Sequence, residues 1–384
     1  MPIFKERSKL SPHYIPEKML HREREQAFIK TVLGGSLDTV PQSFPTVVQV
    51  LGGVGAGKTT LAIKAGRWLE EVGRARRVAV RSIYVNLRGF SGGKVTAYRH
   101  LVRSVAEELF SQSLSAEELL ANMLRHLKRT NTYLLIIFDE LDYYVNQPHG
   151  HTLVYDFSRL PELSAGQPTN VLGVLFISRE GGFRKVLDRP ELSSLGLQIL
   201  RLEPYRKKEA YDIISERARE ALVEGAVSCE VLEFIAEKVS SPPADGDIRF
   251  GLDLLMYAGN LSESQGKKFI GLDDVRRVLA SLYPFVSSDE LAQLDDDEKV
   301  VLLALSRVLR VSERTYTAIA SIARTCEVIS EETGRRPVGD IYSVLRGLEE
   351  KGVVELNNRN EVGLRNLDVQ SLERFLESII GSMN

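Results

Sequence analysis

The segment VVQVLGGVGAGKTT, residues 47–60, constrains the fold of this 384-residue chain more than any other stretch. It begins with a short apolar run rich in β-branched residues, which predicts a buried strand. Gly52, Gly57, Lys58 and Thr59 then match the phosphate-loop template G-x-x-x-x-G-K-[ST], and a helical pattern follows. A strand, a glycine-rich turn and a helix in this order predict an α/β domain that binds nucleotide phosphates.

The spacing of this motif follows from the chemistry of phosphate binding. Glycines adopt backbone angles that are closed to other residues, so successive N–H groups can point at phosphate oxygens. The helix start adds unpaired N–H donors and a partial positive charge. We expect Lys58 to reach the β- and γ-phosphates and the Thr59 hydroxyl to bind Mg²⁺. The predicted phosphate-binding residues are Gly53, Val54, Gly55, Ala56, Gly57, Lys58, Thr59 and Thr60.

A second nucleotide-site signal is the segment YLLIIFDELDYY, residues 133–144. It has the pattern of an apolar strand that ends in Asp139 and Glu140. A carboxylate at the end of a buried strand beside a phosphate loop can hold Mg²⁺, usually through water. An adjacent glutamate can orient or deprotonate the attacking water. We therefore predict Asp139 as a metal ligand with Thr59, and Asp139 and Glu140 as catalytic residues with Lys58.

The pattern of apolar residues divides the chain into domains. Strands and helices alternate up to residue 202, which predicts a parallel sheet covered on both faces. The first helix is expected to start near Glu17 or His21 and to end at Leu33–Gly35. A strand is expected around Ser82 to Asn86, and the helix TAYRHLVRSVAEELF is expected to have Leu101, Val105 and Leu109 on one face. Four helices are expected after the sheet, with Pro242-Pro243-Ala244-Asp245-Gly246 separating the second from the third. Three helices, a hairpin and a last helix then follow, an order typical of a winged helix. The predicted domains are an N-terminal arm, mobile or loosely docked, at 1–13, a nucleotide-binding base domain at 14–202, a helical lid domain at 203–286 and a winged-helix domain at 287–384.

Composition limits the partners and the compartment. The formal net charge is −2, so any surface for nucleic acid must be local. Residues 64–103 have the strongest bias, with ten basic and two acidic residues, which fits either a solvated face or a nucleic-acid contact. Cys229 and Cys326 suggest neither disulfides nor zinc, and we expect both in the core. With no signal peptide and no apolar run long enough for a bilayer, we predict a cytoplasmic protein without a membrane partner.

The predicted third helix of the winged-helix domain, within residues 338–352, has two distinct faces. Its buried stripe is expected to be Ile341, Val344, Leu345 and Leu348, and its outward face Gly339, Ser343, Arg346 and Glu350. A helix in this position can enter a major groove. Residues 290–384 contain 12 basic and 17 acidic residues, so docking to a protein is the alternative.

Several segments together resemble AAA+ ATPases of the archaeal origin-recognition and cell-division-control type, the replication initiators. The resemblance covers nearly the whole chain, and its most specific part is the junction into the lid, LDRPELSSLG followed by LEPYRKKEAYDIISERA. The segments that carry the rest of it are YIPEKMLHRERE, VNLRGFSGGKVTAYRHLVRSVAEEL, IIFDELDYY, DGDIRFGLDLL and DIYSVLRGLEEKGVV. The resemblance implies an AAA+ P-loop domain, an all-helical lid and a C-terminal winged helix.

The resemblance also implies further site residues. Tyr14, Ile15, Pro16 and Arg22 correspond to the segment that lies over adenine, and Arg249 to the sensor arginine of the lid. Candidate DNA contacts lie in the winged helix and around the initiator-specific insertion, where Arg88, Lys94, Arg99 and Arg103 form a cluster with no acidic residue between them. The expected DNA-binding residues are Arg88, Lys94, Arg99, Arg335, Arg336, Ser343, Arg346, Arg359 and Arg365.

The chain departs from the family pattern at two places near the nucleotide. The family usually ends its fourth strand with Ser-Asn-Asp, whose Asn senses the γ-phosphate, but this chain has Ser178, Arg179 and Glu180. The candidate arginine finger of the family is displaced by one position, to Arg189. We therefore expect ATP binding with slow hydrolysis.

The leading hypothesis is an ATP-binding replication initiator, with ATP, ADP and Mg²⁺ as ligands and ATP acting as a slow switch. It would bind double-stranded origin DNA through the winged helix and the insertion and help to recruit the replicative helicase, with paralogous initiators as further partners. The main alternative is a signal-transducing AAA+ or STAND-like NTPase whose winged helix docks protein. A P-loop kinase for a small molecule is a more remote alternative, because the lid and winged helix leave no evident acceptor pocket.

Overall fold

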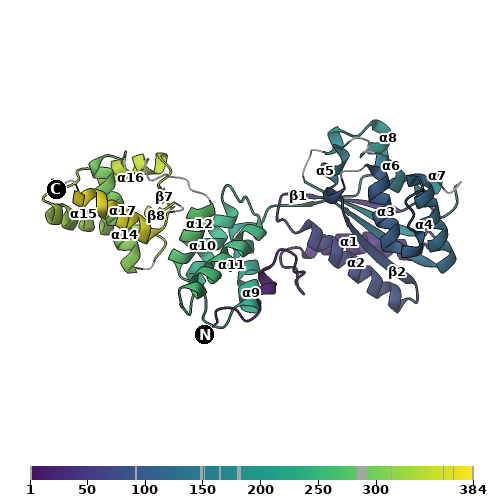
Figure 1. Ribbon diagram of the computed structural model, residues 1–384, viewed down its shortest axis with the longest axis horizontal. Helices are drawn as coiled ribbons and strands as arrows, with labels where there is room; N and C mark the ends of the chain where they lie inside the picture. The colour runs from purple at the N-terminus through teal and green to yellow at the C-terminus, as the bar shows by residue number, and fades with distance from the viewer. Residues whose placement is uncertain are drawn as a thin grey trace. The chain divides into compact units, whose positions relative to one another are not determined.

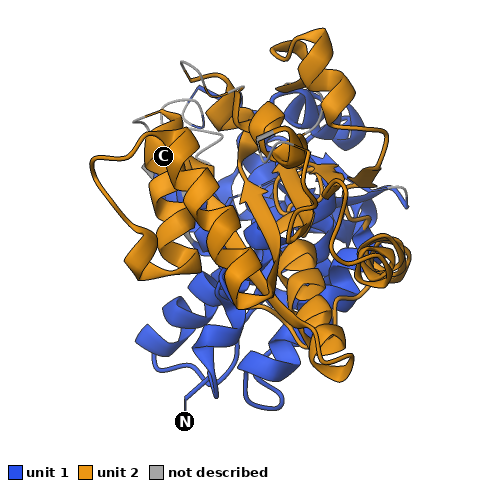
Figure 2. Cartoon of the chain, turned by 90° about the vertical axis from the view of Figure 1, so that its right-hand side faces the viewer, with its two compact units in different colours: residues 1–14, 207–244, 248–384 blue, residues 15–206, 245–247 orange. Residues whose placement is uncertain are grey.

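The structure is a computed structural model, and the chain forms two compact units (Figures 1 and 2). Unit 1 contains residues 1–14, 207–244 and 248–384, and unit 2 contains residues 15–206 and 245–247. The described residues are 2–90, 93–147, 150, 152–163, 166–179, 183–282, 291, 293–312, 314–357, 359–365 and 367–382.

Unit 2 is built on a five-stranded parallel sheet in the order β2-β3-β4-β1-β5. The strands contain long runs of buried aliphatic residues, as expected when both faces of a parallel sheet are covered. Their bounds are β1 Thr46–Gly52, β2 Ala79–Asn86, β3 Thr132–Asp139, β4 Val171–Ser178 and β5 Ile199–Leu202. The predicted parallel sheet is confirmed, and β2 begins earlier than Ser82, where we expected it.

Helices cover both faces of this sheet (Figure 1). One apolar cluster joins a face of the sheet to α1 (Glu23–Asp38) and α2 (Lys58–Ala75). The other joins the opposite face to α3 (Lys94–Val105), α4 (Ala116–Thr130) and α6 (Thr152–Ser158). Shorter helices follow the strands: α5 Leu141–Val145, α7 Leu160–Leu163 and α8 Arg189–Ser194.

Two predicted helix bounds in unit 2 are wrong. Helix α1 begins at Glu23, two residues after His21 and not near Glu17, and it continues through Gly34 and Gly35 instead of ending there. Its buried Leu33 and Leu37 need the helical spacing to stay on one face, and a methyl group at Gly34 would lie 3.4 Å from the Trp68 ring. Helix α3 ends at Val105, so Leu109 does not extend its apolar face.

Unit 1 begins with the four predicted lid helices. They are α9 Lys207–Ala221, α10 Cys229–Ser240, α11 Ile248–Ser264 and α12 Leu272–Leu282. The predicted Pro-Pro-Ala-Asp-Gly segment forms a turn that separates α10 from α11. Cys326 is buried as expected, but Cys229, the first residue of α10, is exposed, so the expectation for Cys229 is wrong. No helix among the described residues has both the length and the apolar character needed to cross a bilayer.

The N-terminal segment is not the mobile or loosely docked arm that we predicted. Ile3, Phe4 and Leu10 are buried, and the carbonyl of Ile3 accepts a hydrogen bond from Val223 N–H at 2.9 Å. The Phe4 ring lies so close to α11 that a methyl group at Gly259 would be 2.4 Å from its Cζ atom. Apolar burial therefore makes this segment part of unit 1.

The C-terminal part of unit 1 has the predicted winged-helix order. Leu345 and Leu348 are buried, Ile341 and Val344 are partly buried, and the predicted outward face is exposed. A short strand, β6, adds a third member to the predicted hairpin and gives a sheet of order β6-β8-β7. The elements are α14 Asp296–Ser312, β6 Thr317–Ala318, α15 Ile319–Thr333, α16 Ile341–Glu350, β7 Val354–Leu356, β8 Glu361–Leu364 and α17 Val369–Ser382.

A polar network joins the lid to the winged helix within unit 1. The Tyr316 hydroxyl donates to carboxylates of Glu237 on α10 and Glu355 on β7, and Lys238 Nζ lies 2.6 Å from Glu355. The buried Arg276 of α12 donates to the Thr315 carbonyl at 3.1 Å. Because an uncompensated buried charge is costly, these contacts favour a single arrangement of lid and winged helix. The predicted domain boundary at 286/287 lies outside the described residues.

The docking of the N-terminal segment is testable by Phe4→Ala. This change should lower the free energy of unfolding by about 3 kcal/mol, because it removes a buried ring and leaves a cavity. Urea unfolding followed by circular dichroism measures the effect, and Glu6→Ala, an exposed position of the same segment, is the control. Equal unfolding midpoints for the two variants would show that the segment is not docked.

Candidate functional site

The phosphate loop connects β1 to α2 and has the backbone that its glycines predict. Gly55 and Gly57 have φ angles of 66° and 91°, in the left-handed region that favours glycine. Gly57 precedes the first helical residue, Lys58. The Lys58 Nζ atom donates to the carbonyl oxygens of Gly52 and Gly53, both at 2.7 Å. The lysine therefore already lies over the loop where phosphates would bind.

The carboxylate of Asp139 joins three elements at the end of β3. Its Oδ2 atom accepts hydrogen bonds from the Thr59 hydroxyl of α2 at 2.6 Å and from the Tyr84 hydroxyl of β2 at 3.0 Å. Its Oδ1 atom accepts from Glu140 N–H at 2.8 Å. Burial, and then the charge of Asp139, raise the pKa of Tyr84 well above its usual range. Tyr84 thus stays protonated and donates to the carboxylate, a role that no sequence motif predicted.

The two predicted metal ligands are brought together. Thr59 and Asp139 supply a hydroxyl and a carboxylate oxygen, the oxygen donors that Mg²⁺ prefers, with phosphate and water completing such a shell. Asp139 is only 5% exposed, so its charge is suited to a cation. No cluster of three or more His, Cys, Asp or Glu residues suited to a metal occurs in the described part of the chain. The Thr59 hydroxyl and the Asp139 carboxylate are oxygen donors that fit a magnesium ion whose other ligands would be phosphate and water.

A segment from between two lid helices packs against the phosphate loop and belongs to unit 2. A methyl group at Gly55 would lie 1.7 Å from Oδ1 of Asp247. Another at Gly246 would lie 2.7 Å from the backbone nitrogen of Tyr205. The predicted site residue Arg249 follows Asp247 by two positions but lies in α11 of unit 1. No sequence pattern predicted this close approach of residues 245–247 to the loop.

Arg22 supports the phosphate loop through its buried guanidinium. Its side chain donates to the Ala56 carbonyl at 3.3 Å and to the Tyr205 hydroxyl at 3.1 Å. The guanidinium also lies over the Tyr205 ring, 4.1 Å from its centre. We predicted Arg22 as a nucleotide-binding residue, and the structure places it against the loop itself.

Ile15 and Pro16 line a hollow of about 580 Å³ between their segment, α1 and α2. Lys64 of α2, which the sequence analysis did not single out, donates to the Pro16 carbonyl at 3.0 Å. Burial, followed by the nearby cations Arg67 and Lys30, lowers the pKa of Lys64.

Tyr14 belongs to unit 1, apart from the neighbouring Ile15 and Pro16 of unit 2. Its ring contacts Lys9 and Arg217, which lie 4.4 Å and 4.2 Å from its centre. The structure therefore gives this predicted nucleotide contact cationic partners from the N-terminal segment and the lid.

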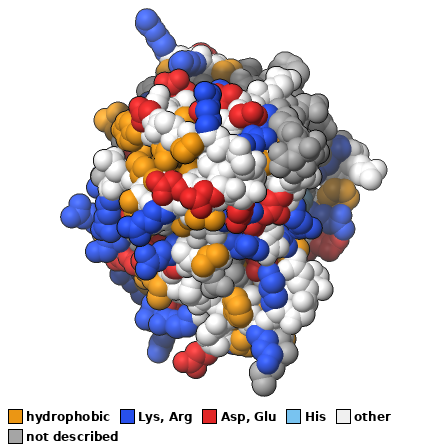
Figure 3. Space-filling view, turned by 90° about the vertical axis from the view of Figure 1, so that its left-hand side faces the viewer, with side chains coloured by type: hydrophobic (Ala, Val, Ile, Leu, Met, Phe, Trp, Pro, Cys, Tyr) orange, Lys and Arg blue, Asp and Glu red, His pale blue; other side chains and the backbone are white. Residues whose placement is uncertain are grey.

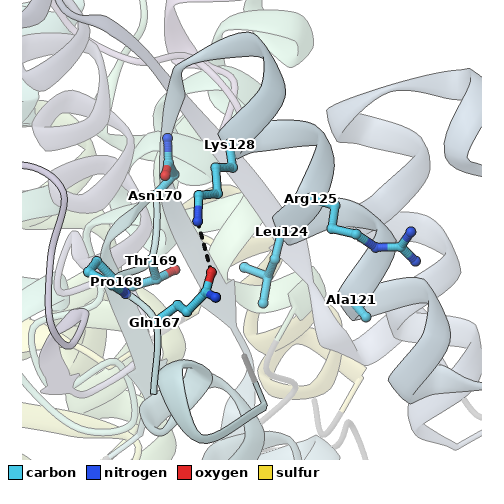
Figure 4. A pocket seen from close by; sticks show the side chains of 8 residues that line it. All are labelled: Ala121, Leu124, Arg125, Lys128, Gln167, Pro168, Thr169 and Asn170. Atoms are coloured by element: carbon cyan, nitrogen blue, oxygen red, sulfur yellow. Dashed lines mark hydrogen bonds between the residues drawn. The ribbon is translucent and has the colours of Figure 1, made fainter. Parts of the chain in front are cut away.

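A smaller hollow of about 280 Å³ lies at the opposite end of the strands, where α4 meets the segment that leads into β4 (Figure 4). Its polar groups bind one another or the backbone: Lys128 Nζ donates to Gln167 at 2.8 Å, and the Asn170 amide donates to the Thr132 carbonyl at 3.3 Å. Thr132 begins β3, whereas Asp139 ends it. This hollow is therefore separate from the phosphate loop.

Comparison with known families and proteins agrees with this geometry. Residues 45–187 match the family described as AAA domain, and residues 211–280 match the Cdc6 AAA+ ATPase-type lid domain. The chain is 30% identical over 307 residues to ORC1-type DNA replication protein 1 of Sulfolobus acidocaldarius, covering 79% of this chain and 73% of that one. This chain belongs to the ORC1-type DNA replication proteins. It is also 27% identical over 370 residues to ORC1-type DNA replication protein 2 of Saccharolobus solfataricus, covering 92% and 86% of the two chains.

Solved structures show that the ORC1-type fold extends over the whole chain. The crystal structure of Cdc6p from Pyrobaculum aerophilum is similar, with a TM-score of 0.81, 26% identity and 99% of each chain covered. The Aeropyrum pernix ORC1 protein, solved in complex with DNA, has the same fold, with a TM-score of 0.64, 24% identity, and 100% of this chain and 99% of that one covered. The AAA+ base with a helical lid and a winged helix is thus the architecture of this ORC1-type protein.

The candidate DNA-binding residues of the insertion mostly have partners within the chain. Lys94 pairs with Glu117 and lies 3.6 Å from Asp156. Arg103 pairs with Glu107 at 2.6 Å. The remaining two also contact the protein: Arg99 donates to the Gln112 carbonyl, and Arg88 lies over the Tyr143 ring. We expected a cluster with no acidic residue inside it, but the fold brings carboxylates to it from α4, α6 and the turn after α3.

The candidate DNA-binding side chains of the winged helix differ in exposure and in their partners within the chain. Arg346 contacts Glu349 at 3.0 Å, and Arg335 lies 3.6 Å from Asp296. Arg336 and Arg359 are exposed, and no described hydrogen bond or ion pair occupies their guanidinium groups. Ser343 and Arg365 are also exposed. Acidic and basic side chains are interspersed over the described part of the face in Figure 3. DNA would therefore have to contact individual basic residues rather than a continuous basic surface.

The contact between the loop and residues 245–247 is testable with two alanine substitutions. Gly55→Ala should lower stability by about 1–3 kcal/mol, because its φ angle is strained for alanine and Asp247 occupies the space of the methyl group. Gly53→Ala is the matched control, since a methyl group there would meet no atom within 4 Å. Thermal unfolding compares the two, and equal melting temperatures would contradict the packing.

Proposed function

We propose that this ORC1-type protein is an ATP-controlled initiator that binds double-stranded origin DNA and helps to load the replicative helicase. The observation that best supports the ATP part is the Thr59–Asp139 hydrogen bond beside a complete phosphate loop. Family membership supports the initiator part. The helicase and paralogous initiators as partners rest on family resemblance alone.

Nucleotide binding would begin with Lys58. Its ammonium group donates to two backbone carbonyls, and phosphate oxygens would be stronger acceptors because they are charged. Thr59 and Asp139 would hold Mg²⁺, which neutralises charge on the phosphates. Glu140, partly exposed next to Asp139, would orient the attacking water.

Nucleotide binding could switch the conformation of the lid because the site includes residues 245–247, which lie between two lid helices in the sequence. Asp247 touches the phosphate loop, and Arg249 is the second residue of the next lid helix, α11, so phosphate binding by Arg249 would bias the position of that helix. The lid and the winged helix share unit 1 and are joined by the Tyr316 network. A movement of the lid would therefore carry the winged helix with it.

DNA binding would depend on a few cations rather than on overall charge. The exposed guanidinium groups of Arg336 and Arg359 are the best placed to contact phosphates. The other candidates in the same domain are Arg335, Ser343, Arg346 and Arg365. Arg88, Lys94 and Arg99 form the second group. Two separated contacts on one duplex would fix its register. The alternative of a protein-docking winged helix finds no support in the relatives.

The ATPase assignment is testable by a pair of variants. Lys58→Ala should lose ATP binding, whereas Glu140→Gln should bind ATP and hydrolyse it about 10²–10⁴-fold more slowly than the wild type. Nucleotide titration and phosphate release measure the two effects, and Arg74→Ala, exposed on the same helix, is the control. Unchanged ATP affinity in Lys58→Ala, or a wild-type rate on the order of 10 s⁻¹, would contradict a slow ATP switch.

The DNA assignment is testable by Arg359→Ala. Loss of one phosphate contact should weaken duplex binding and lower the slope of log K against log salt by roughly 0.9. Lys94→Ala should act in the same direction but more weakly, because Lys94 must first leave two carboxylates. Arg374→Ala, exposed on α17, is the control. Wild-type binding by both variants at every salt concentration would favour protein docking instead.

A further inference from the structure

Two basic segments that are distant in the sequence come to the same end of the sheet in unit 2. Residues 74–77 include the end of α2 and precede β2, and residues 125–129 lie in the last turns of α4 and precede β3. Helix α2 packs against β2 and helix α4 against β3. The two strands are paired in parallel from their first residues, Ala79 and Thr132. Both segments therefore lie where these strands begin, whereas Asp139 lies where β3 ends.

The two segments present exposed cations that few carboxylates neutralise. Among the described residues, only one carboxylate lies within ion-pair distance of any of them, that of Asp38, 2.5 Å from Arg76. Lys128 Nζ donates to the amide oxygen of Gln167 at 2.8 Å, and the Arg125 guanidinium is directed away from that amide (Figure 4). The other side-chain partners are Asn122 for Arg125 and His126 for Arg129. The exposed cations are Arg74, Arg76, Arg77, Arg125, Lys128 and Arg129.

Arg77 occupies a backbone position where glycine is the usual residue. Its φ angle is 59°, in the left-handed region. The Arg77 N–H donates to the Arg74 carbonyl at 3.1 Å, and the Val78 N–H donates to the Gly73 carbonyl at 2.9 Å. These two hydrogen bonds end α2 in a Schellman motif, in which glycine causes less backbone strain than any other residue. An exposed cation therefore stands where the local backbone favours glycine.

The surface lacks the apolar side chains that a protein partner would bury. None of the exposed large hydrophobic residues in the described part of the chain belongs to either segment. Protein interfaces are usually centred on buried aromatic or apolar anchors, and single-stranded nucleic acid needs aromatic side chains on which its bases stack. All the cations except Lys128 are arginines, whose planar guanidinium groups match phosphate oxygens. This chemistry favours the phosphate backbone of a duplex.

We propose that the surface formed by residues 74–77 and 125–129 binds the phosphate backbone of double-stranded DNA without reading its sequence. None of these residues is among the candidate DNA contacts of the insertion or the winged helix, so the inference adds a third contact to the proposed function, on which it rests. Phosphate contacts orient a protein on a duplex but carry no base information. Because the surface lies where the strands begin, DNA bound there leaves the nucleotide site at their carboxyl ends accessible.

The test measures binding of the full-length protein to a duplex of random sequence, by fluorescence anisotropy at several salt concentrations. Arg77→Gly and Arg125→Ala should each weaken binding and lower the slope of log K against log salt by roughly 0.9, and the double variant should lower it by roughly twice that amount. Affinity for a second, unrelated duplex should fall by the same factor, because both sequences offer the same phosphates. Arg24→Ala, an exposed arginine in the first turn of α1, is the control and should change neither quantity.

Arg77→Gly also separates a DNA contact from a structural role. Cations near the C-terminus of a helix stabilise that helix, so an alanine variant could lose stability and DNA binding together. Glycine instead relieves the left-handed backbone strain at residue 77. The melting temperature of Arg77→Gly should therefore stay the same or rise while its duplex affinity falls.

Three results would overturn the inference. The first is wild-type duplex affinity and salt slope in the double variant, and if that variant also loses binding to polyglutamate, the surface belongs to an acidic protein instead. The second is weaker binding with an unchanged salt slope, since phosphates would then not be the ligand. The third is a loss of affinity confined to variants that melt at a lower temperature. If the wild type binds no duplex at all, the proposed function itself fails, and that result does not depend on any variant of this surface.

Discussion

The hydrogen bond between Thr59 and Asp139 is the contact on which the rest of the site depends. It joins the first turn of the phosphate-loop helix to the end of β3, although 80 positions separate the two residues. Because β4 is paired with both β1 and β3, the carboxyl ends of these strands lie at the same end of the sheet. The sheet order therefore brings the glycine loop and the metal ligands together.

Much of this arrangement was predictable because it follows from local patterns. The strand runs, the phosphate loop and the lid helices each have a periodicity or a motif that can be read from a few consecutive residues. The winged helix was predictable for the same reason, apart from the two-residue strand β6, which is too short to leave a pattern. The alternation of Ser82 and Tyr84 along β2 would have shown that Tyr84 shares a face with α2.

The features that were missed depend on contacts between distant parts of the chain. The N-terminal segment looked polar, yet three apolar residues suffice to bury it against the lid. The carboxylate partners of Lys94 come from α4 and α6, so a count of charges along the insertion could not reveal them. Asp247 reaches Gly55 only because the chain returns to the loop between two lid helices. In each case tertiary packing, and not local propensity, decides the outcome.

Coupling between nucleotide and DNA is the central claim, and a linked titration tests it most directly. Duplex affinity is measured without nucleotide, with ADP and with an ATP analogue, and ATP-analogue affinity is measured with and without duplex. If the two sites are coupled, the triphosphate changes duplex affinity by roughly 5–150-fold, and duplex changes triphosphate affinity by the same factor. Identical duplex affinity in all three nucleotide states would contradict it.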